Sequence, residues 1–189
     1  LNEIGLKMVN SIEHRGPDGN GILVEEQNNN RNILLAHTRL SIIDLSKAGS
    51  QPMSTKDKKL WIVYNGEIYN YREIKDELMA KGIKFYSETD TEIILESYRF
   101  WGMDCFEKFI GMWALALWDK KNNAMILSRD RLGIKPLYYH HNKNKVIFGS
   151  EPKAIIQGIN KSLHLNHQAV SDYFSYRYVL NGGSFFKEI

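Results

Sequence analysis

The chain has 189 residues, of which 43% are hydrophobic and 25% are charged, and its formal net charge is +3. This length and composition predict one globular domain with a sizeable core and exclude a disordered or fibrous chain. The one cysteine, Cys105, excludes an internal disulfide and indicates a reducing, cytoplasmic compartment. Basic residues are dispersed and no apolar run reaches membrane-spanning length, so neither a nucleic acid nor a membrane is an expected partner.

Hydrophobic periodicity predicts both helices and strands along the chain. Two helices carry boundary signals: Gly82 ends one of them, and Thr89-Asp90-Thr91-Glu92 is a capping box that opens the next. In chain order, the expected elements are a helix at 6–13, strands at 32–37, 39–44 and 59–65, helices at 71–81 and 89–101, strands at 112–118, 124–129, 137–140 and 145–149, and helices at 151–157 and 167–176.

The expected strand at 112–118 is apolar on both faces. A sheet with one wet face could not bury both sets of side chains, so helices must cover one face and a second sheet the other. Short connections between the strands indicate hairpins, and therefore mainly antiparallel sheets. The sequence thus predicts a layered α+β sandwich.

Asn65-Gly66-Glu67, at the end of the expected strand at 59–65, has two interpretations. An Asn side-chain amide and a Gly backbone N–H can donate to one point, as in an oxyanion hole for acyl transfer. Asn-Gly between apolar runs is also the strongest short signal for a hairpin turn. This dipeptide alone favours the turn, and the rest of the chain decides between them.

Other polar segments also have a structural and a functional interpretation. The segment 14–19 is either a helix exit followed by a loop, or part of a functional site. The segment 128–133 is either an ion-pair network with a turn, or part of a functional site. Arg39 could pair with an aspartate or bind a carboxylate bidentately. Asp90 could simply complement a helix N-terminus. The histidines are scattered, and neither a metal-ligand set nor a phosphate-binding loop is recognised.

Taken together and in order, these polar segments are far more specific than any one of them. They read His14-Arg15-Gly16-Pro17-Asp18-Gly19, Ala36-His37-Thr38-Arg39-Leu40-Ser41-Ile42-Ile43-Asp44, Ser50-Gln51-Pro52-Met53, Tyr64-Asn65-Gly66-Glu67-Ile68-Tyr69-Asn70, Thr89-Asp90-Thr91-Glu92, Phe109-Ile110-Gly111-Met112-Trp113-Ala114, Arg129-Asp130-Arg131-Leu132-Gly133-Ile134-Lys135-Pro136-Leu137-Tyr138-Tyr139 and Gly149-Ser150-Glu151. Over nearly the whole chain, 1–189, the sequence closely resembles the N-terminal glutaminase domain of the glutamine-hydrolysing asparagine synthetases. These are class II glutamine amidotransferases with the N-terminal nucleophile (Ntn) hydrolase fold.

The resemblance implies a four-layer αββα sandwich of two mainly antiparallel sheets and a thioester mechanism. An N-terminal cysteine attacks the side-chain amide of L-glutamine, with its own α-amino group as the base, and ammonia leaves. The implied oxyanion hole is the Asn65 side chain with the Gly66 N–H. The other implied glutamine-binding groups are Arg39 for the α-carboxylate, the backbone around Leu40 and Ile42, and the backbone around Gly66 and Glu67, with Asp90, for the α-amino group.

The nucleophile and the ATP-using half of such an enzyme are not found in these residues. The expected cysteine would lie a few tens of residues before Leu1, in a strand that this chain lacks, and Cys105 is interpreted as a small buried hydrophobe. The tail 178–189 is expected to lead toward a C-terminal synthetase domain, where ATP and Mg would act, with no cofactor in this domain. Besides that domain and L-glutamine, a second copy of the chain in a homodimer is a candidate partner. As written, the chain is expected to bind glutamine without cleaving it.

Three functions remain open at this point. The first is a fragment of an asparagine synthetase that amidates aspartate with ammonia from glutamine. The second is the same glutaminase serving another acid, such as a sugar carboxylate in polysaccharide synthesis. The third is a non-catalytic module that binds glutamine or serves as an interaction surface.

Overall fold

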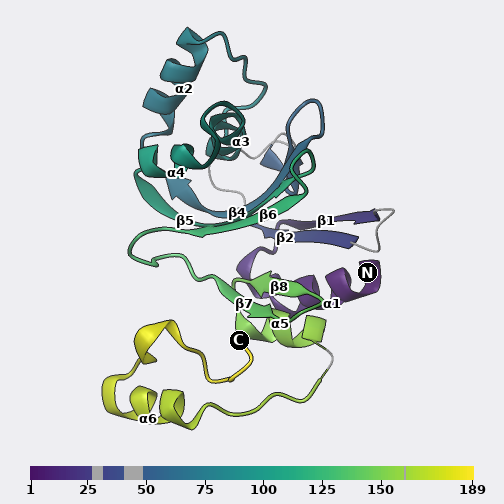
Figure 1. The fold of residues 1–189 in the computed structure, drawn as a ribbon, viewed down its shortest axis with the longest axis vertical. Coiled ribbons are helices and arrows are strands. Elements are labelled where there is room, and N and C mark those ends of the chain that lie inside the picture. Colours follow the sequence, from purple (N-terminus) through teal and green to yellow (C-terminus); the bar gives the residue numbers. More distant parts are fainter. Residues whose placement is uncertain (27–31, 41–48, 160) are drawn as a thin grey trace.

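Two β layers lie between two helical layers in the computed structural model, which describes residues 1–26, 32–40, 49–159 and 161–189 (Figure 1). The first helical layer covers the outer face of the larger sheet. It contains α2 (Tyr71–Ala80), α3 (Asp90–Trp101) and α4 (Cys105–Lys108). The predicted four-layer α+β sandwich is therefore confirmed.

The larger sheet has four antiparallel strands in the order β3-β4-β5-β6. Their bounds are β3 (Met53–Ser54), β4 (Leu60–Ile68), β5 (Gly111–Asp119) and β6 (Ala124–Arg129). Strands β4 and β5 are paired along their whole length, from Leu60 opposite Asp119 to Ile68 opposite Gly111. The short β3 covers only Trp61 and Ile62, so most of the β4 edge lies beyond the end of β3.

Two hairpins make up the second β layer. They are β1 (Gly19–Glu26) with β2 (Asn32–Arg39), and β7 (Tyr138–His141) with β8 (Val146–Gly149). Helices α1 (Asn2–Ser11) and α5 (Pro152–Ile159) cover the outer side of this layer (Figure 1). Helix α6 (His167–Tyr176) lies at the end of the molecule beyond α5, and the C-terminal tail turns back to β7, where the Glu188 carbonyl oxygen lies 2.7 Å from His140 Nδ1 (Figure 1). Short 3₁₀ turns occupy Glu13–Arg15, Gly102–Asp104 and Leu180–Gly182.

Side chains of β4 and β5 alternate between two separate hydrophobic clusters, because successive residues of a strand point to opposite faces. Ile62 and Leu117 belong to the cluster shared with the helices α2 and α3. Val63 and Ala116 belong to the cluster shared with Leu35 of β2. The strand at 111–119 is therefore buried on both faces, as its apolar sequence predicts.

Most predicted elements are confirmed, and two boundaries are wrong. The first helix begins at Asn2, earlier than the expected residue 6. Strand β4 continues through Asn65 and Gly66 to Ile68, so these residues form no hairpin turn. The turn interpretation fails because Asn65 and Gly66 pair with Ala114 and Trp113, which are distant in sequence. Of the strand expected at 39–44, Arg39 ends β2 and residues 41–44 lie outside the described residues.

The segment 128–133 is a turn, but its charged side chains bond to the backbone rather than to one another. The Asp130 carboxylate accepts hydrogen bonds from the N–H groups of Trp113, Leu132, Ile134 and Lys135 at 2.9–3.2 Å. Arg131 donates to the carbonyls of Phe106, Glu107 and Phe109. This network fixes the connection from β6 to β7, and the ion-pair expectation is corrected.

Candidate active site

A cavity of about 590 Å³ lies between the two β layers. Its walls come from α1, β2, β4, β5, β8 and the start of α3. Every predicted site residue that the structure describes lines this cavity, and the set is Arg39, Leu40, Asn65, Gly66, Glu67 and Asp90. Ile42 lies outside the described residues. Residues separated by up to 51 positions in the sequence therefore meet at one site.

Asn65 directs its side chain between the β layers, because it shares a strand face with Val63. Its partner on β5 is Ala114, whose small side chain leaves room on that face. The Asn65 Nδ2 atom is buried and has no hydrogen-bond partner in the described part of the chain. A buried amide donor without a partner costs about 1–3 kcal/mol. An acceptor brought into the cavity would recover that cost.

The Gly66 N–H points along the sheet to the free edge of β4. Trp113, which faces Gly66 on β5, exchanges its backbone hydrogen bonds with Asp130 on its other side. Gly66 therefore belongs to a pair that is not hydrogen-bonded across β4 and β5. On the same β4 edge, the N–H of Tyr64 is taken by Gln51 Oε1 at 2.6 Å and that of Ile68 by Asp90 Oδ2 at 3.0 Å.

Only glycine fits at position 66. A Cβ atom there would lie 2.8 Å from Trp113 Cα and would collide with the Met112 carbonyl oxygen. The requirement comes from the close approach of β5, since Gly66 has no positive φ. The Gly66 N–H lies on the residue next to the Asn65 amide, and two donors on neighbouring residues can serve one oxygen.

Asp90 is the first residue of α3, and its carboxylate ties that helix to β4. Oδ2 accepts hydrogen bonds from the Tyr64 hydroxyl at 2.7 Å and from the Ile68 N–H at 3.0 Å. The helix cap is instead Thr89, whose Oγ1 accepts from the Glu92 N–H at 3.3 Å. The predicted helix cap is therefore confirmed at Thr89, and capping does not explain Asp90.

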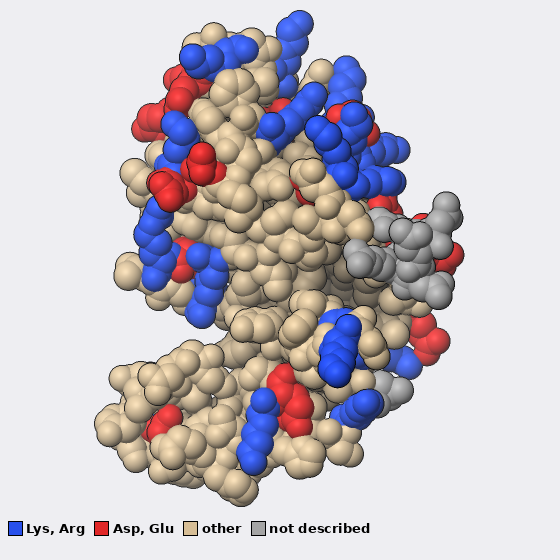
Figure 2. Space-filling model, viewed as in Figure 1, with Lys and Arg blue, Asp and Glu red and all other residues tan. Residues whose placement is uncertain are grey.

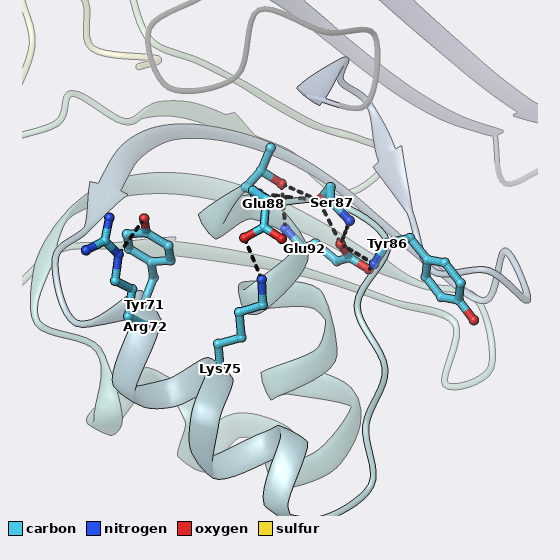
Figure 3. Close-up of polar contacts among 8 residues, drawn as sticks. Tyr71, Arg72, Lys75, Tyr86, Ser87, Glu88 and Glu92 are labelled. Atoms are coloured by element: carbon cyan, nitrogen blue, oxygen red, sulfur yellow. Dashed lines mark hydrogen bonds and ion pairs between the residues drawn. The ribbon is translucent and has the colours of Figure 1, made fainter.

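The loop before α3 is held by Glu92 (Figure 3). The Glu92 carboxylate accepts from the Tyr86 N–H at 2.9 Å, the Ser87 N–H at 2.6 Å and the Ser87 hydroxyl at 2.7 Å. Beside it, Lys75 from α2 reaches Glu88 at 2.7 Å (Figure 3). In a capping box the residue at this position would bond the cap's own N–H. Here Glu92 bonds the loop instead and so fixes the start of α3, including Asp90.

The electrostatics at the Asp90 end of the cavity are negative. Burial raises the pKa of Asp90, and the hydrogen bonds from Tyr64 and Ile68 oppose this shift. The charge of Glu67, an exposed residue on the cavity rim, raises the pKa of Asp90 further. The Glu67 carbonyl is directed at Gly111 on β5, so its side chain rather than its carbonyl faces the site. This end can attract a cation.

Arg39, at the end of β2, supplies positive charge from the opposite layer. The 14–19 segment holds the backbone of Arg39, through a bridge from Pro17 and a 3.0 Å hydrogen bond from the Asp18 N–H to the Arg39 carbonyl. Gly16 packs so closely on β2 that a Cβ there would lie 2.6 Å from the Arg39 nitrogen. The loop interpretation of 14–19 is confirmed, and the loop positions Arg39.

The same loop is fixed to the start of α5. His14 Nε2 and Arg15 Nη1 each lie 3.1 Å from Glu151 Oε1. Hydrogen bonds to Lys153, Arg15 and His14 hold the pKa of Glu151 below its usual range, although burial opposes them. Glu151 therefore stays ionised and links the second helical layer to the loop beneath Arg39.

Sequence reasoning missed two residues that line the cavity, Gln51 and His37. Gln51 accepts from the Tyr64 N–H and donates to the Thr91 hydroxyl at 3.5 Å, so it joins β4 to α3. His37 stands two residues before Arg39 on the same strand face, and this spacing is the one signal that could have identified it.

Cys105 lies on the other side of the larger sheet from the cavity. It is fully buried within the cluster formed with α2 and α3. Burial raises the pKa of its thiol to about 12. A thiol whose pKa lies this far above neutral pH stays protonated and is therefore inert as a nucleophile. Its predicted identity as a small buried hydrophobe agrees with these surroundings.

In the described ranges 1–26, 32–40, 49–159 and 161–189, no group of three or more His, Cys, Asp or Glu side chains is arranged to hold a metal ion. None of the helices in these ranges is both long and apolar enough to cross a membrane.

Two solved structures share the fold of this chain. A solved structure of the glutamine phosphoribosylpyrophosphate amidotransferase from B. subtilis, complexed with ADP and GMP, matches with a TM-score of 0.67 at 19% identity. The match covers 82% of this chain and 41% of that one. A structure titled as the allosteric regulatory enzyme of purine biosynthesis matches with a TM-score of 0.68, also at 19% identity, over 82% and 40%. At such identities the likeness concerns the fold.

Sequence comparison gives the family. The model described as "Glutamine amidotransferase domain" matches residues 2–189, and the chain belongs to this family. A putative glutamine-hydrolysing asparagine synthetase 2 from Methanocaldococcus jannaschii is 42% identical over 96% of this chain. The glutamine-hydrolysing asparagine synthetase 1 of Bacillus subtilis is 38% identical over 94% of it. The chain spans only 38% and 27% of the lengths of these two relatives.

Proposed function

We propose that this domain binds L-glutamine in the cavity between the β layers and hydrolyses its side-chain amide to glutamate and ammonia. The observation that carries the proposal is the buried Asn65 amide, which has no partner among the described residues, next to the Gly66 N–H on the free edge of β4. Donors held in place before the reaction stabilise the negative oxygen of a tetrahedral intermediate. Asn65 and Gly66 are the oxyanion hole in this proposal.

The two charged ends of the cavity suit the rest of glutamine. An α-amino acid carries a carboxylate and an ammonium group, and it needs one cation and one anion in separate places. Arg39 on β2 offers a bidentate partner for the carboxylate. Asp90, with the Glu67 side chain and the Gly66 carbonyl nearby, offers acceptors for the ammonium group. Leu40 and Ile42 are proposed to line the same pocket.

The nucleophile is proposed to be a cysteine thiolate from polypeptide outside these 189 residues, since Cys105 is inert and on the wrong face of the sheet. The thiolate attacks the carboxamide carbon, and the oxygen gains the negative charge. The C–N bond then breaks as the nitrogen takes a proton from the cysteine's α-amino group, which acted as the base. Water hydrolyses the resulting thioester. In this proposal, residues 1–189 alone release no ammonia.

The ammonia is proposed to pass to an ATP-using synthetase domain, where Mg and ATP activate aspartate as the acceptor. Both named relatives are glutamine-hydrolysing asparagine synthetases and extend far beyond the matched length. We propose that such a domain docks around α6, a region with exposed aromatic side chains and few charged ones (Figure 2). These side chains are Tyr173, Phe174, Tyr176, Tyr178 and Phe185. Exposed aromatic residues are enriched at protein interfaces.

The test is an ammonia-release assay on the full-length protein that contains residues 1–189. L-Glutamine should release one ammonia for each glutamate formed, without ATP, and D-glutamine should not react. Adding ATP, Mg and aspartate should then yield asparagine. If the folded full-length protein neither binds nor hydrolyses L-glutamine, the proposed function is wrong. If it hydrolyses glutamine but amidates a sugar carboxylate instead, only the acceptor is wrong.

A further inference from the structure

His37 lines the proposed glutamine cavity and has a buried ring nitrogen that is unpaired within the described residues. It lies on the inner face of β2, between the buried Leu35 and the cavity residue Arg39. Its Nδ1 atom is buried and lacks a hydrogen-bond partner within the described residues. Buried polar atoms in folded proteins are normally paired, so an exception in a cavity points to a ligand group.

The ring of His37 is neutral at physiological pH. Burial lowers the pKa of His37 to about 4, and Arg39 lowers it further, while a hydrogen bond to the Tyr64 backbone opposes the shift. A backbone group that raises the pKa of an imidazole does so by accepting from a ring N–H. One ring nitrogen is thus protonated toward Tyr64, and the unpartnered Nδ1 keeps its lone pair.

The cavity therefore contains two complementary unpaired atoms on facing layers. Asn65 on β4 offers a donor, and His37 on β2 offers an acceptor. A primary carboxamide has one acceptor oxygen and one donor NH₂ group. It can satisfy both atoms together, which neither a carboxylate nor an ester can do.

We propose that His37 is a specificity-determining residue: its Nδ1 accepts a hydrogen bond from the carboxamide NH₂ of glutamine while Asn65 donates to the carboxamide oxygen. This inference rests on the proposed function and extends it. The γ-carboxylate of glutamate would direct a lone pair at the His37 lone pair. The contact therefore favours the amide substrate over the acid product, as a site built to bond an N–H rejects analogues that lack it.

The first experiment compares two substrates of the full-length protein, L-glutamine and the γ-methyl ester of L-glutamate. The ester has the same carbonyl but no N–H on its leaving group. His37→Leu should lower kcat/KM for glutamine on the order of tenfold to a hundredfold, the effect of leaving a buried polar group unpaired. The same variant should change kcat/KM for the ester by no more than about threefold. A fold defect would lower both equally.

His37→Asn is the matched control, because its side-chain oxygen can occupy the place of Nδ1. This variant should recover most of the glutamine activity. L-Glutamate should inhibit His37→Leu more strongly, relative to glutamine, than it inhibits the wild type. In the wild type, ¹⁵N NMR of the imidazole should show an unprotonated Nδ1.

The outcomes separate this inference from the proposed function. Equal losses on amide and ester in a folded His37→Leu variant, or a protonated Nδ1 in the wild type, would overturn the role of His37 and leave the glutaminase in place. A wild-type protein that hydrolyses neither substrate would overturn the proposed function itself.

Discussion

The two faces of strands β4 and β5 differ in what they leave unpaired. The face toward α2 and α3 is closed and apolar, and its residues include Ile62, Ile68 and Leu117, all fully buried. The face toward the second β layer has the small residues Ala114 and Ala116 and a cavity. It also has a buried Asn65 amide without a partner in the described part of the chain. Both faces are formed by the same backbone, so the rigidity of one positions the chemistry of the other.

Because successive residues of a strand point to opposite faces of the sheet, neighbouring residues of one strand can serve stability and function separately. A change at Ile62 of β4 or at Leu117 of β5 alters the closed core, with the cost of a cavity. Asn65, on the other side of β4, faces the site, and it is held in place at the expense of an unsatisfied donor. Such a cost is typical of a site that is organised before its ligand arrives.

The largest effect is expected on the cavity face. Asn65→Ala in the full-length protein should lower kcat for glutamine hydrolysis by on the order of a hundredfold or more, since an oxyanion donor acts mainly in the transition state. KM should change much less. Unfolding should be little affected, because the lost amide had no partner among the described residues. Steady-state kinetics and thermal unfolding of the same preparation measure both.

The opposite pattern is expected on the closed face. Leu117→Ala should cost about 2–5 kcal/mol of unfolding free energy, because it leaves a cavity in a packed core. Leu117 is fully buried and does not line the site. Activity per folded molecule should stay close to that of the wild type. Denaturant unfolding, together with kcat normalised by active-site titration, tests this, and a hundredfold loss of normalised kcat would erase the distinction between the faces.

Asp90→Asn should weaken glutamine recognition by about 2 kcal/mol, the low end for losing a buried charge pair, because Asn can still accept a hydrogen bond. KM would then rise about thirtyfold. Stability should not fall, since burial raises the pKa of Asp90 and the charged form is costly in the fold.

The pH dependence of that variant has a definite sign. A carboxyl whose pKa is higher in the folded state binds more protons there than in the unfolded chain. Wild-type stability should therefore fall as pH rises from the ordinary Asp range through the raised pKa, and Asp90→Asn should lack this contribution. Unfolding free energies of both proteins across this range measure the difference. A variant that becomes relatively less stable with rising pH would contradict the buried-charge account.

Arg39→Lys should have a smaller effect, a loss of about 1.5 kcal/mol for one charge-assisted hydrogen bond, because an ammonium group cannot form the bidentate fork. The loss should appear in KM for glutamine. The KM for glutaric acid monoamide, which lacks the α-amino group but keeps the carboxylate, should rise by the same factor. An unchanged KM for both compounds would assign Arg39 to the scaffold.

The smallest effect is expected for Cys105→Ser. Its thiol is buried on the closed face with a pKa raised to about 12, so it takes no part in the chemistry. The full-length variant should keep glutaminase activity within about a factor of two, apart from a modest loss of stability for a buried polar hydroxyl. Loss of glutaminase activity from a folded Cys105→Ser variant would mean that the nucleophile was misassigned.

The sequence predicted the layers of this fold because its periodicity is strong. The apolar run at 112–118 requires that both faces of the strand be covered. The helices α2 and α3 cover one face, and the second β layer covers the other. The capping signal at Thr89 gave the start of α3 within one residue. The Asn65-Gly66 pair was misleading as a local signal, because its pairing with Ala114 and Trp113 is set by contacts nearly fifty residues away.

The site was predicted less completely than the fold. Motif resemblance supplied Arg39, Asn65 and Asp90, and the structure brings these side chains to one cavity. His37 and Gln51 escaped notice, because the role of each depends on which backbone N–H or ring nitrogen is left unpaired. Pairing of this kind exists only once the strands have met, so no sequence pattern encodes it.

The most direct test of the oxyanion hole compares two inhibitors of the full-length enzyme. A thiolate adds to the γ-aldehyde of L-glutamate, and the tetrahedral oxygen that forms lies in the proposed oxyanion hole. L-Glutamate itself binds without forming that oxygen. Asn65→Ala should weaken inhibition by the aldehyde by on the order of a hundredfold, about 2.7 kcal/mol, and change the Kd of L-glutamate by less than about threefold. Equal changes for both inhibitors would contradict the claim that Asn65 serves the transition state.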